Sequence, residues 1–519
     1  MIRRLFTGFG GPAEVRELLA WNTDPEMLFR RIRQLPGAIF FDSSGNVGAL
    51  GKYSILLFDP FAELTVTGNR VRFKRHAPFD SGISGANRKI PRFPFDREDF
   101  EIDSDPFDVM RAMLDFFRVP ESDPPRHTDR GNGAVSSARQ TFPCENGCAA
   151  GYFSYDLGFS IERIRERAEK DIDIPTVTLG LYDTAVVTDH SEQAAYLCIA
   201  DCPNGRTGAS DPDRIAGIRS RFLPTDGEPE AETVDFECGL MESGFSAGDY
   251  CAAVSKAREY IRDGDIYQVN LSQRFEGRFS GDPYHAYRTL RKKCPAPFSA
   301  YMSFGPLQIL SNSPERFFEI DGRVIRTRPI KGTRPRGKSP DEDNALRLDL
   351  EESEKDRAEL TMIVDLLRND LGRVCRLGSV RVEKLFETES YANVFHRVAT
   401  IRGECAEGLN AADILRGVFP GGSITGTPKI RAMEIIEELE PVKRGIYTGS
   451  LGYIGFDGRS DLNIAIRTLV CYSNRLYYQV GGGIVWDSDP MDEYEETMHK
   501  GRSIRETLLG FRNEPPGRF

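Results

Sequence analysis

Hydrophobic and polar positions follow a strand-like pattern in the first half of the chain. Short runs rich in β-branched and aromatic residues are bounded by turn residues, which is typical of strands. These runs span residues 51–60, 149–156 and 185–190. The first half is therefore predicted to be mostly strand.

The second half mixes two periodicities. Apolar residues recur at intervals of three and four over residues 249–262 and 353–370, which predicts two helices. Three further runs predict strands, over 299–304, 308–310 and 475–480. Because these elements do not alternate as βαβ units, the expected fold class is α+β. No internal repeat at the short periods of solenoid proteins is found.

Three stretches rich in Gly, Pro, Ser, Asp or Arg predict linkers or surface loops, over residues 79–97, 119–143 and 203–235. A chain of 519 residues exceeds what a single core usually supports. The third stretch is the best boundary, so we expect a β-rich region over 1–235 and a second region over 236–512.

Composition and charge exclude some classes of protein. With 39% hydrophobic and 28% charged residues, the chain resembles an ordinary globular protein. No apolar run approaches the roughly 20 residues that span a bilayer, and the basic start is not followed by the apolar stretch of a secretory signal. The net charge of −11 argues against non-specific nucleic-acid binding. We expect a cytoplasmic protein that binds neither membranes nor nucleic acid.

Lys331 is the first candidate for chemistry, because it stands amid four arginines. A lysine becomes a nucleophile when burial or cationic neighbours favour its neutral form. Arginines also bind carboxylates in bidentate fashion, which would suit an acidic substrate. The alternative is a solvated basic loop. The four arginines are Arg326, Arg328, Arg334 and Arg336.

Two acidic positions are candidate metal ligands. Glu359 follows a capping serine in the helix predicted over 353–370 and lies beside apolar positions, so it points either into a site or into solvent. Glu493, Glu496 and Lys500 fall on one helical face, which alternatively forms a surface ion-pair ladder. Glu359 and Glu496 would suit Mg²⁺ if the fold brings them together, which spacing alone does not show.

Two glycine-rich segments, 419–429 and 480–485, have two interpretations. They either offer backbone N–H groups to an anion or form tight turns that need positive φ. Neither matches a Walker A or dinucleotide-binding motif, so ATP and NAD are not indicated.

Glu315 and His396 complete the candidates from residue type. Apolar neighbours of Glu315 could raise its pKa toward the range of a general acid, whereas an edge-strand salt bridge is the equal alternative. His396 is either a site histidine or a satisfied core group.

Taken in order along the chain, these segments resemble the chorismate-utilising enzymes. Within that family they are most similar to the aminodeoxychorismate synthase component I branch, the sister of anthranilate synthase component I, which remains the alternative. Lys331 stands where anthranilate synthases typically carry alanine, and residues 419–426 read Phe-Pro-Gly-Gly-Ser-Ile-Thr-Gly. The resemblance implies an α+β fold like that of anthranilate synthase component I, with two large β-rich layers and helices packed outside. It makes 236–512 the chorismate-binding catalytic domain.

The resemblance also implies a reaction. Lys331 would attack ring carbon two of chorismate while Glu315 protonates the hydroxyl that leaves carbon four. Ammonia would then displace the lysine, giving 4-amino-4-deoxychorismate for 4-aminobenzoate and folate biosynthesis. Gln268 stands where relatives that use water carry a lysine, which favours ammonia as the nucleophile.

Further roles come from the resemblance alone. The implied Mg²⁺ ligands are Glu359 and Glu496. The implied pocket residues are His396, near the leaving hydroxyl, with Thr333 and Thr425. The residues implied to bind carboxylates of the substrate are Tyr447, Arg467, Gly482, Gly483 and Lys500.

Two binding partners are implied in the same way. No glutaminase motif with a cysteine nucleophile is found, so a separate glutamine amidotransferase subunit is expected to supply ammonia. The first half resembles a region that binds tryptophan in relatives, and the positions that fall there are Asp42, Ser43, Ser44, Tyr53 and Ser54. A catalytically silent regulatory subunit would lack the lysine or the acidic residues, yet Glu315, Lys331, Glu359 and Glu496 are all present.

Overall fold

The computed structural model describes residues 14–43, 48–76, 95, 99–119, 141–201, 209, 211–222 and 236–509. The three predicted linkers fall largely outside these ranges. Among the described residues, no helix is both long enough and apolar enough to cross a membrane.

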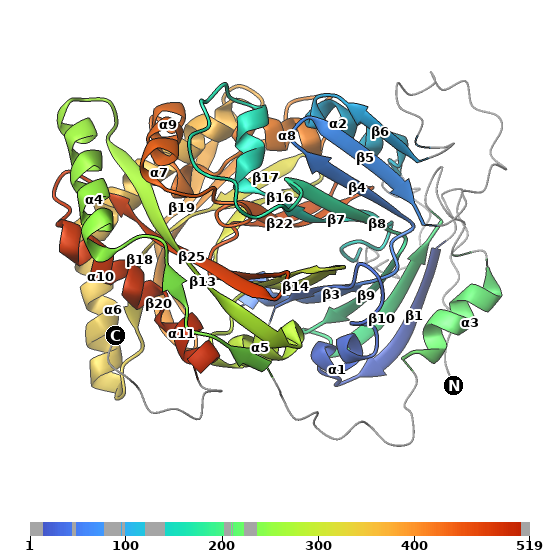
Figure 1. The fold of residues 1–519 in the computed structure, drawn as a ribbon. Coiled ribbons are helices and arrows are strands. Elements are labelled where there is room, and N and C mark those ends of the chain that lie inside the picture. The colour runs from blue at the N-terminus through green and yellow to red at the C-terminus, as the bar shows by residue number, and fades with distance from the viewer. Residues whose placement is uncertain are drawn as a thin grey trace, which may run out of the picture.

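Two antiparallel sheets form the centre of the molecule (Figure 1). The 13-stranded sheet has the order β1 (Glu14–Trp21), β10 (Ala194–Ala200), β9 (Thr184–Asp189), β3 (Tyr53–Leu57), β2 (Ile39–Asp42), β14 (Phe298–Phe304), β15 (Leu307–Ser313), β24 (Thr468–Tyr472), β25 (Arg475–Ile484), β13 (Gln268–Gly281) and β11 (Phe236–Cys238). Two short strands, β12 (Glu242–Ser243) and β21 (Gly426–Thr427), also pair with β13.

The 12-stranded sheet lies on the other side of the core. Its order is β18 (Ile330–Pro335), β20 (Val394–Glu404), β17 (Val324–Arg328), β16 (Arg316–Asp321), β23 (Ser460–Asn463), β22 (Ser450–Gly455), β7 (Cys148–Phe153), β8 (Val177–Tyr182), β4 (Ala62–Thr67), β5 (Arg70–Arg75) and β6 (Phe100–Asp103), and β19 (Arg381–Ser390) pairs with β20.

Both halves of the chain contribute strands to each sheet. In the 13-stranded sheet, β2 pairs with β14 through Asp42 and Ser299. In the 12-stranded sheet, β7 pairs with β22 through Phe153 and Ser450. The boundary expected near residue 235 therefore does not separate one sheet from the other.

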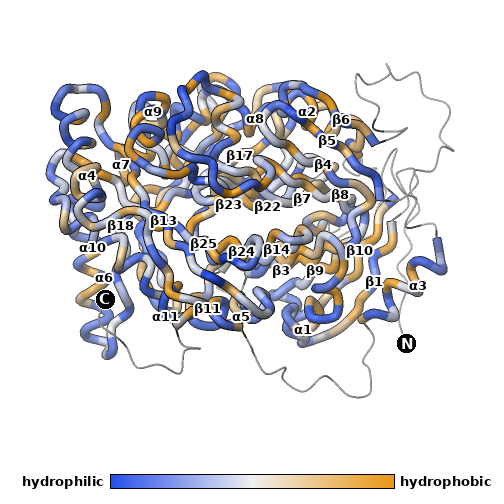
Figure 2. The backbone as a smooth tube through the Cα atoms, in the orientation of Figure 1, coloured by the Kyte–Doolittle hydropathy of each residue, from blue (hydrophilic) through white to orange (hydrophobic). Residues whose placement is uncertain are grey.

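Central strands are buried on both faces. In β3, Ile55 and Leu57 face the core between the sheets, while Leu56 faces the outer helices. A strand that is covered on both faces carries apolar residues at nearly every position, which is why these segments are hydrophobic throughout. Figure 2 shows hydrophobic residues along the central strands and hydrophilic residues along α3 (Pro212–Ser220) at the surface.

Helices cover the outer faces of both sheets (Figure 1). The 13-stranded sheet is covered by α1 (Pro25–Arg30), α3, α5 (Pro283–Lys293) and α11 (Arg502–Leu509). The 12-stranded sheet is covered by α2 (Pro106–Phe116), α7 (Glu354–Gly372) and α8 (Ala411–Val418). At one end, α4 (Ala247–Arg262), α9 (Lys429–Leu439) and α10 (Pro490–Lys500) pack around β13, and α6 (Pro340–Glu352) lies beside β18. The remaining elements are the 3₁₀ turns η1 (Gly48–Gly51), η2 (Tyr155–Ser160) and η3 (Gly422–Ile424).

The arrangement confirms the expected α+β class with two β-rich layers and helices outside. The helices predicted over 249–262 and 353–370 are α4 and α7, and Ser353 caps α7 by accepting a hydrogen bond of 3.2 Å from the Asp356 N–H. The predicted strands are confirmed as β3, β7, β9, β14, β15 and β25.

One glycine-rich segment differs from the expected turn. Gly481, Gly482 and Gly483 continue β25 in register with β13, and none of them has a positive φ. A Cβ atom at Gly481 would lie 2.5 Å from the Leu271 carbonyl oxygen, so glycine here permits close approach of the two strands. The interpretation of 480–485 as a tight turn is therefore wrong. The other segment leads into α9, as expected.

Candidate active site

Three elements bring Lys331, Glu315 and Glu496 together. Lys331 lies on β18, Glu315 directly precedes β16, and Glu496 lies on α10. Burial is the largest influence on both carboxyl groups and acts to raise the pKa of each, whereas the positive charge of Lys331 acts to lower it. A candidate nucleophile thus lies within electrostatic range of two candidate site carboxylates that come from distant parts of the chain.

Glu315 has the environment of a general acid. Its residue is 6% exposed, and burial raises the pKa of its carboxyl to about 7, against smaller opposing effects of a hydrogen bond with Ser423 and the charge of Lys331. Strand β16 lies between β17 and β23, so the edge-strand interpretation is wrong. Among the described side chains, none forms an ion pair with Glu315. Its proton is therefore available near neutral pH.

The four arginines around Lys331 are each held by carboxylates. Arg326 lies near Glu319 and Glu383, Arg328 near Glu387 and Glu389, Arg334 near Asp349 and Asp356, and Arg336 near Asp343. Their charges are neutralised locally, which reduces the effect that the four arginines were expected to have on Lys331. Lys331 itself forms no ion pair and no side-chain hydrogen bond with any residue that the structure describes.

His396 and Thr333 form a second pair in the site. The two residues are opposite each other on β20 and β18, and Thr333 Oγ1 lies 2.8 Å from His396 Nδ1. Burial, and then the charge of Arg467, lower the pKa of His396 to about 3. The imidazole is therefore neutral at pH 7, and its tautomer decides which partner donates the hydrogen bond.

Arg467 is a cation without a carboxylate partner in the part of the chain that the structure describes. Burial lowers its pKa, and its backbone has a positive φ of 50°. Its charge acts on His396, which places the two side chains in one environment. Tyr447 is buried, and burial raises the pKa of its phenol. A half-buried guanidinium without a carboxylate partner among the described residues is suited to binding an anionic ligand.

Helix α10 presents an acidic face to the bare backbone of β25. A Cβ atom at Gly482 would lie 3.1 Å from Glu493 Oε2, 3.5 Å from Glu496 Oε1 and 3.7 Å from Lys500 Nζ. Lys500 Nζ lies 2.6 Å from Glu496 Oε1 and donates to the Gly481 carbonyl at 3.1 Å. Burial and the neighbouring charge of Glu496 raise the pKa of Glu493, against an opposing hydrogen bond from Ser488. Two carboxylates and one lysine of α10 thus meet at Gly482.

Glu359 lies on α7. It is one helical turn from Lys355, whose charge acts on both Glu493 and Glu496. Within the described ranges, Glu359 has no ion pair, and no three His, Cys, Asp or Glu side chains are grouped closely enough to hold a metal. Mg²⁺ usually needs only one or two carboxylates plus water and substrate, so this donor chemistry fits. The Glu359–Glu496 metal site remains a prediction.

Gln268 and Thr425 line the same end of β13. A Cβ atom at Gly483 would lie 2.3 Å from Gln268 Nε2, so this glycine accommodates the buried Gln268 side chain. Gln268 Oε1 has no hydrogen-bond partner among the described residues. Thr425 Oγ1 donates to the Gly421 carbonyl at 3.1 Å, so it stabilises the loop that carries Ser423.

Sequence reasoning did not assign roles to Ser423 and Glu493. Ser423 forms the hydrogen bond with Glu315, and Glu493 lies beside Glu496. The sequence contained a signal for each of these two residues. Ser423 belongs to the glycine-rich segment 419–429, and Glu493 precedes Glu496 by one helical turn.

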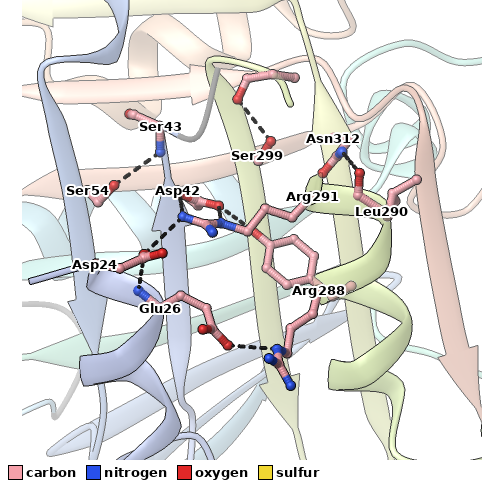
Figure 3. A network of polar contacts seen from close by, with 12 residues as sticks. Asp24, Glu26, Asp42, Ser43, Ser54, Arg288, Leu290, Arg291, Ser299 and Asn312 are labelled. Carbon is pink, nitrogen blue, oxygen red and sulfur yellow. Dashed lines mark hydrogen bonds and ion pairs between the residues drawn. The ribbon is translucent and has the colours of Figure 1, made fainter. Parts of the chain in front are cut away.

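The residues of the possible tryptophan site form a polar network at β2 and β3 (Figure 3). Asp42 accepts hydrogen bonds from Arg291 Nε at 2.5 Å and from the Tyr287 hydroxyl at 3.2 Å. The Ser43 N–H donates to Ser54 Oγ at 3.2 Å, and the Ser43 hydroxyl donates to the Tyr53 carbonyl at 2.6 Å. Ser44 lies outside the described residues. Protein groups thus already bind Asp42 and Ser43, and ligand binding here remains a prediction.

Comparisons with known proteins find relatives over most of the chain. A family model described as chorismate binding enzyme matches residues 98–506. Aminodeoxychorismate synthase component 1 of Escherichia coli (strain K12) is 36% identical over 491 residues, which cover 94% of this chain and 97% of that protein. Anthranilate synthase component 1 of Acetivibrio thermocellus is 33% identical over 500 residues, covering 95% and 94%.

A solved structure confirms the expected fold. The crystal structure of anthranilate synthase component I from Streptococcus pneumoniae TIGR4 matches with a TM-score of 0.71 and 30% identity, covering 87% of this chain and 92% of that one. The family match spans more than three quarters of the chain and includes Glu315, Lys331, Glu359 and Glu496. This chain belongs to the family of chorismate binding enzymes.

Proposed function

We propose that this chain is component I of an aminodeoxychorismate synthase, which converts chorismate and ammonia into 4-amino-4-deoxychorismate for 4-aminobenzoate and folate biosynthesis. The observation that carries the proposal is the pair formed by Lys331 and Glu315. A lysine without an ion pair among the described residues acts on a carboxyl group whose pKa is about 7. Covalent catalysis with a protonated leaving group requires a nucleophile and an acid of this kind.

The proposed reaction has two displacements. First, the neutral amine of Lys331 forms a bond to ring carbon two, the ring double bonds shift, and the hydroxyl at carbon four leaves as water with the proton of Glu315. Second, ammonia forms a bond to carbon four, the double bonds shift back, and the bond to Lys331 breaks. The new amino group returns one proton to Glu315, and the enolpyruvyl group is retained.

Other residues bind and orient the substrate in this proposal. Arg467, Tyr447 and the backbone of Gly482 and Gly483 bind the enolpyruvyl carboxylate, and Lys500 provides a further positive charge. Neutral His396, oriented by Thr333, donates a hydrogen bond to the leaving hydroxyl. Thr425 and Gln268 shape the pocket.

Glu359 and Glu496 are the proposed ligands of Mg²⁺. When bound, the ion supplies positive charge that offsets the ring carboxylate of chorismate. The approach of Glu493 and Glu496 to each other at Gly482 supports a cation at this position, because a cation would offset their mutual repulsion.

A partner subunit is part of the proposal. The relatives are named as component 1 of their synthases, so we propose that a glutamine amidotransferase subunit supplies ammonia to this chain in the cytoplasm. Tryptophan is the proposed ligand of the network around Asp42 and Ser43.

Product analysis tests the function. The purified chain is mixed with chorismate, Mg²⁺ and ammonium chloride, and products are identified by chromatography and mass spectrometry. We expect a product that retains the enolpyruvyl group and becomes 4-aminobenzoate when an aminodeoxychorismate lyase is added. Anthranilate and pyruvate would instead establish the alternative, anthranilate synthase component I, which the Acetivibrio and Streptococcus relatives make the second candidate.

A further inference from the structure

A cavity of about 380 Å³ is lined by residues of β24 and β25, of η2 and of the loop that carries Tyr447. Its wall on the 13-stranded sheet includes Thr468 and Gln479, and its opposite wall includes Asp156 and Lys443. Tyr447, a proposed substrate contact, also lines it, and Thr468 directly follows Arg467. Tyr447 is therefore the proposed enolpyruvyl-carboxylate contact that the cavity reaches.

Two buried acceptors in this cavity lack donors. Asp156 Oδ1 and Gln479 Oε1 are both buried and have no hydrogen-bond partner among the described residues. Gln479 as a whole is 4% exposed. A buried acceptor without a donor is destabilising, so a ligand that donates hydrogen bonds would be stabilised here.

The cations of the cavity are already neutralised. Arg274 is paired with Asp171, and Lys443 Nζ lies 2.8 Å from Glu437 Oε2 and 3.1 Å from Glu166 Oε2. Asp156, in contrast, forms no ion pair with any described residue. The cavity thus has unused acceptors and no unused positive charge at these positions, which favours a small cationic donor over an anion.

We propose that this cavity binds ammonium, with the Asp156 carboxylate and the Gln479 side-chain carbonyl as acceptors, and that Asp156 removes one proton to release ammonia toward Tyr447. The inference rests on the proposed function, since that reaction consumes ammonia. One N–H bond of ammonium breaks and one O–H bond forms on Asp156, which yields neutral ammonia and a neutral carboxyl group. Asp156 later returns this proton to water.

The electrostatic surroundings of Asp156 suit repeated proton transfer. Burial raises its pKa to about 7, the charge of Lys443 opposes this shift, and the charges of Glu437 and Glu166 add to it. The carboxyl group can therefore gain and lose a proton near neutral pH.

The kinetic test uses the full chain with chorismate, Mg²⁺ and ammonium chloride as the only nitrogen source. Asp156→Asn keeps the size of the side chain and removes its charge, so we expect the KM for ammonium to rise by about tenfold or more while the KM for chorismate stays unchanged. Asp321→Asn is the control, because Asp321 is exposed at the end of β16, forms no ion pair among the described residues and does not line the cavity. A control with unchanged constants isolates the effect of Asp156.

The pH dependence separates a proton acceptor from a structural residue. In the wild type, kcat/KM for ammonium should fall as the pH is lowered through about 7, because Asp156 becomes protonated. Asp156→Asn should lack this step. Ionisation of Glu315 acts in the opposite direction, since it removes the proposed acid as the pH rises.

A binding measurement is independent of the reaction. We expect ammonium chloride to raise the Tm of the wild type above its value in the same concentration of sodium chloride, and Asp156→Asn to lose that difference. If Asp156→Asn does not fold, Gln479→Met removes the other acceptor and should show the same losses.

Specific outcomes would overturn the inference. An unchanged KM for ammonium, equal increases in both KM values, or equal Tm values of the wild type in the two salts would each contradict it. A wild-type chain that makes no aminated product would refute the proposed function instead, and the salt comparison would still test the cavity.

Discussion

Thr333 Oγ1 lies 2.8 Å from His396 Nδ1, and this contact joins β18 to β20 two residues beyond Lys331. The register of the two strands shifts between Ile330 and Thr333, so Lys331 lies in a bulge. Gly332 has a φ of +85°, and a Cβ atom there would lie 2.9 Å from Asp356 Cγ. Bulges commonly redirect a side chain near a functional site, and here the bulge frees Lys331 from the regular ladder.

Replacing Lys331 tests its proposed role as nucleophile. Lys331→Ala should reduce formation of 4-amino-4-deoxychorismate by at least about 10³-fold, because the covalent step has no other nucleophile. Lys331→Arg retains the charge but should be equally inactive. The exposed Lys338 of the same segment provides the control Lys338→Ala. Product formation at the wild-type rate by Lys331→Ala, measured by mass spectrometry, would exclude the covalent mechanism.

Glu315 predicts a pH limit on activity. Because burial raises the pKa of its carboxyl to about 7, the fraction of enzyme with a protonated Glu315 falls as the pH rises through that value. We expect kcat to decline on the alkaline side of about pH 7, and Glu315→Gln to lose most activity at all pH values. A kcat profile of the wild type that stays flat from pH 6 to well above 7 would contradict the assignment.

The same pKa shift predicts a change of stability with pH. The unfolded carboxyl has a pKa of 4.5, whereas the folded one has a pKa of about 7, so the folded state binds more protons between these values. The stabilisation by Glu315 is complete below the unfolded pKa and is lost as the pH rises through the folded pKa. We therefore expect Glu315→Gln to gain stability relative to the wild type between pH 5 and pH 8. Denaturant unfolding at the two pH values measures this difference.

Gly483 is expected to be sensitive to a single methyl group. Gly483→Ala would place a Cβ atom 2.3 Å from Gln268 Nε2, so the buried glutamine would have to move. We expect a higher KM for chorismate and a lower kcat. The control is Gly372→Ala near the end of α7, where a Cβ atom meets nothing within 4 Å. Steady-state kinetics of both variants decide the question, and wild-type constants for Gly483→Ala would show that Gln268 is not held in place.

The proposed metal ligands predict a dependence on Mg²⁺. Glu359→Gln and Glu496→Gln each remove one charged oxygen ligand, so we expect half-maximal activity to require about tenfold more Mg²⁺ or higher, and full chelation to stop turnover. Glu495→Gln is the matched control on α10, because Glu495 is exposed and lies beside Glu496 in sequence. Activity that survives complete chelation would refute the assignment.

Local patterns allowed much of the fold to be predicted. Helix α7 has a capping serine and an apolar stripe, and β14 and β15 are short apolar runs between turn residues, so each is visible in its own segment. The pairing of β2 with β14 could not be predicted from periodicity, because strands more than 250 residues apart meet only through the packing of the whole chain.

The candidate site shows the same limit. The sequence indicated Lys331 and Glu315 as candidates, but it did not show that carboxylates on α6, α7 and β19 pair with the neighbouring arginines. The glycines of β25 were interpreted as a turn for a similar reason, since their role depends on Leu271 and Gln268 across the ladder. Identities of site residues were therefore easier to predict than their electrostatic surroundings.

A buried ion pair beside the site provides a last prediction. Lys429 Nζ lies 2.8 Å from Asp370 Oδ2 and donates to the Val418 carbonyl at 2.9 Å. Val418 and Lys429 are at the two ends of the loop that carries Ser423. Lys429→Met leaves the Asp370 carboxylate buried without its partner, so we expect the free energy of unfolding to fall by about 3–5 kcal/mol. Asp370→Asn combined with Lys429→Met should recover part of this loss. Lys256→Met, which removes an exposed ion pair with Glu259, should leave the stability nearly unchanged. Urea unfolding of the four proteins measures these differences, and equal stability of Lys429→Met and the wild type would show that the pair does not stabilise the loop.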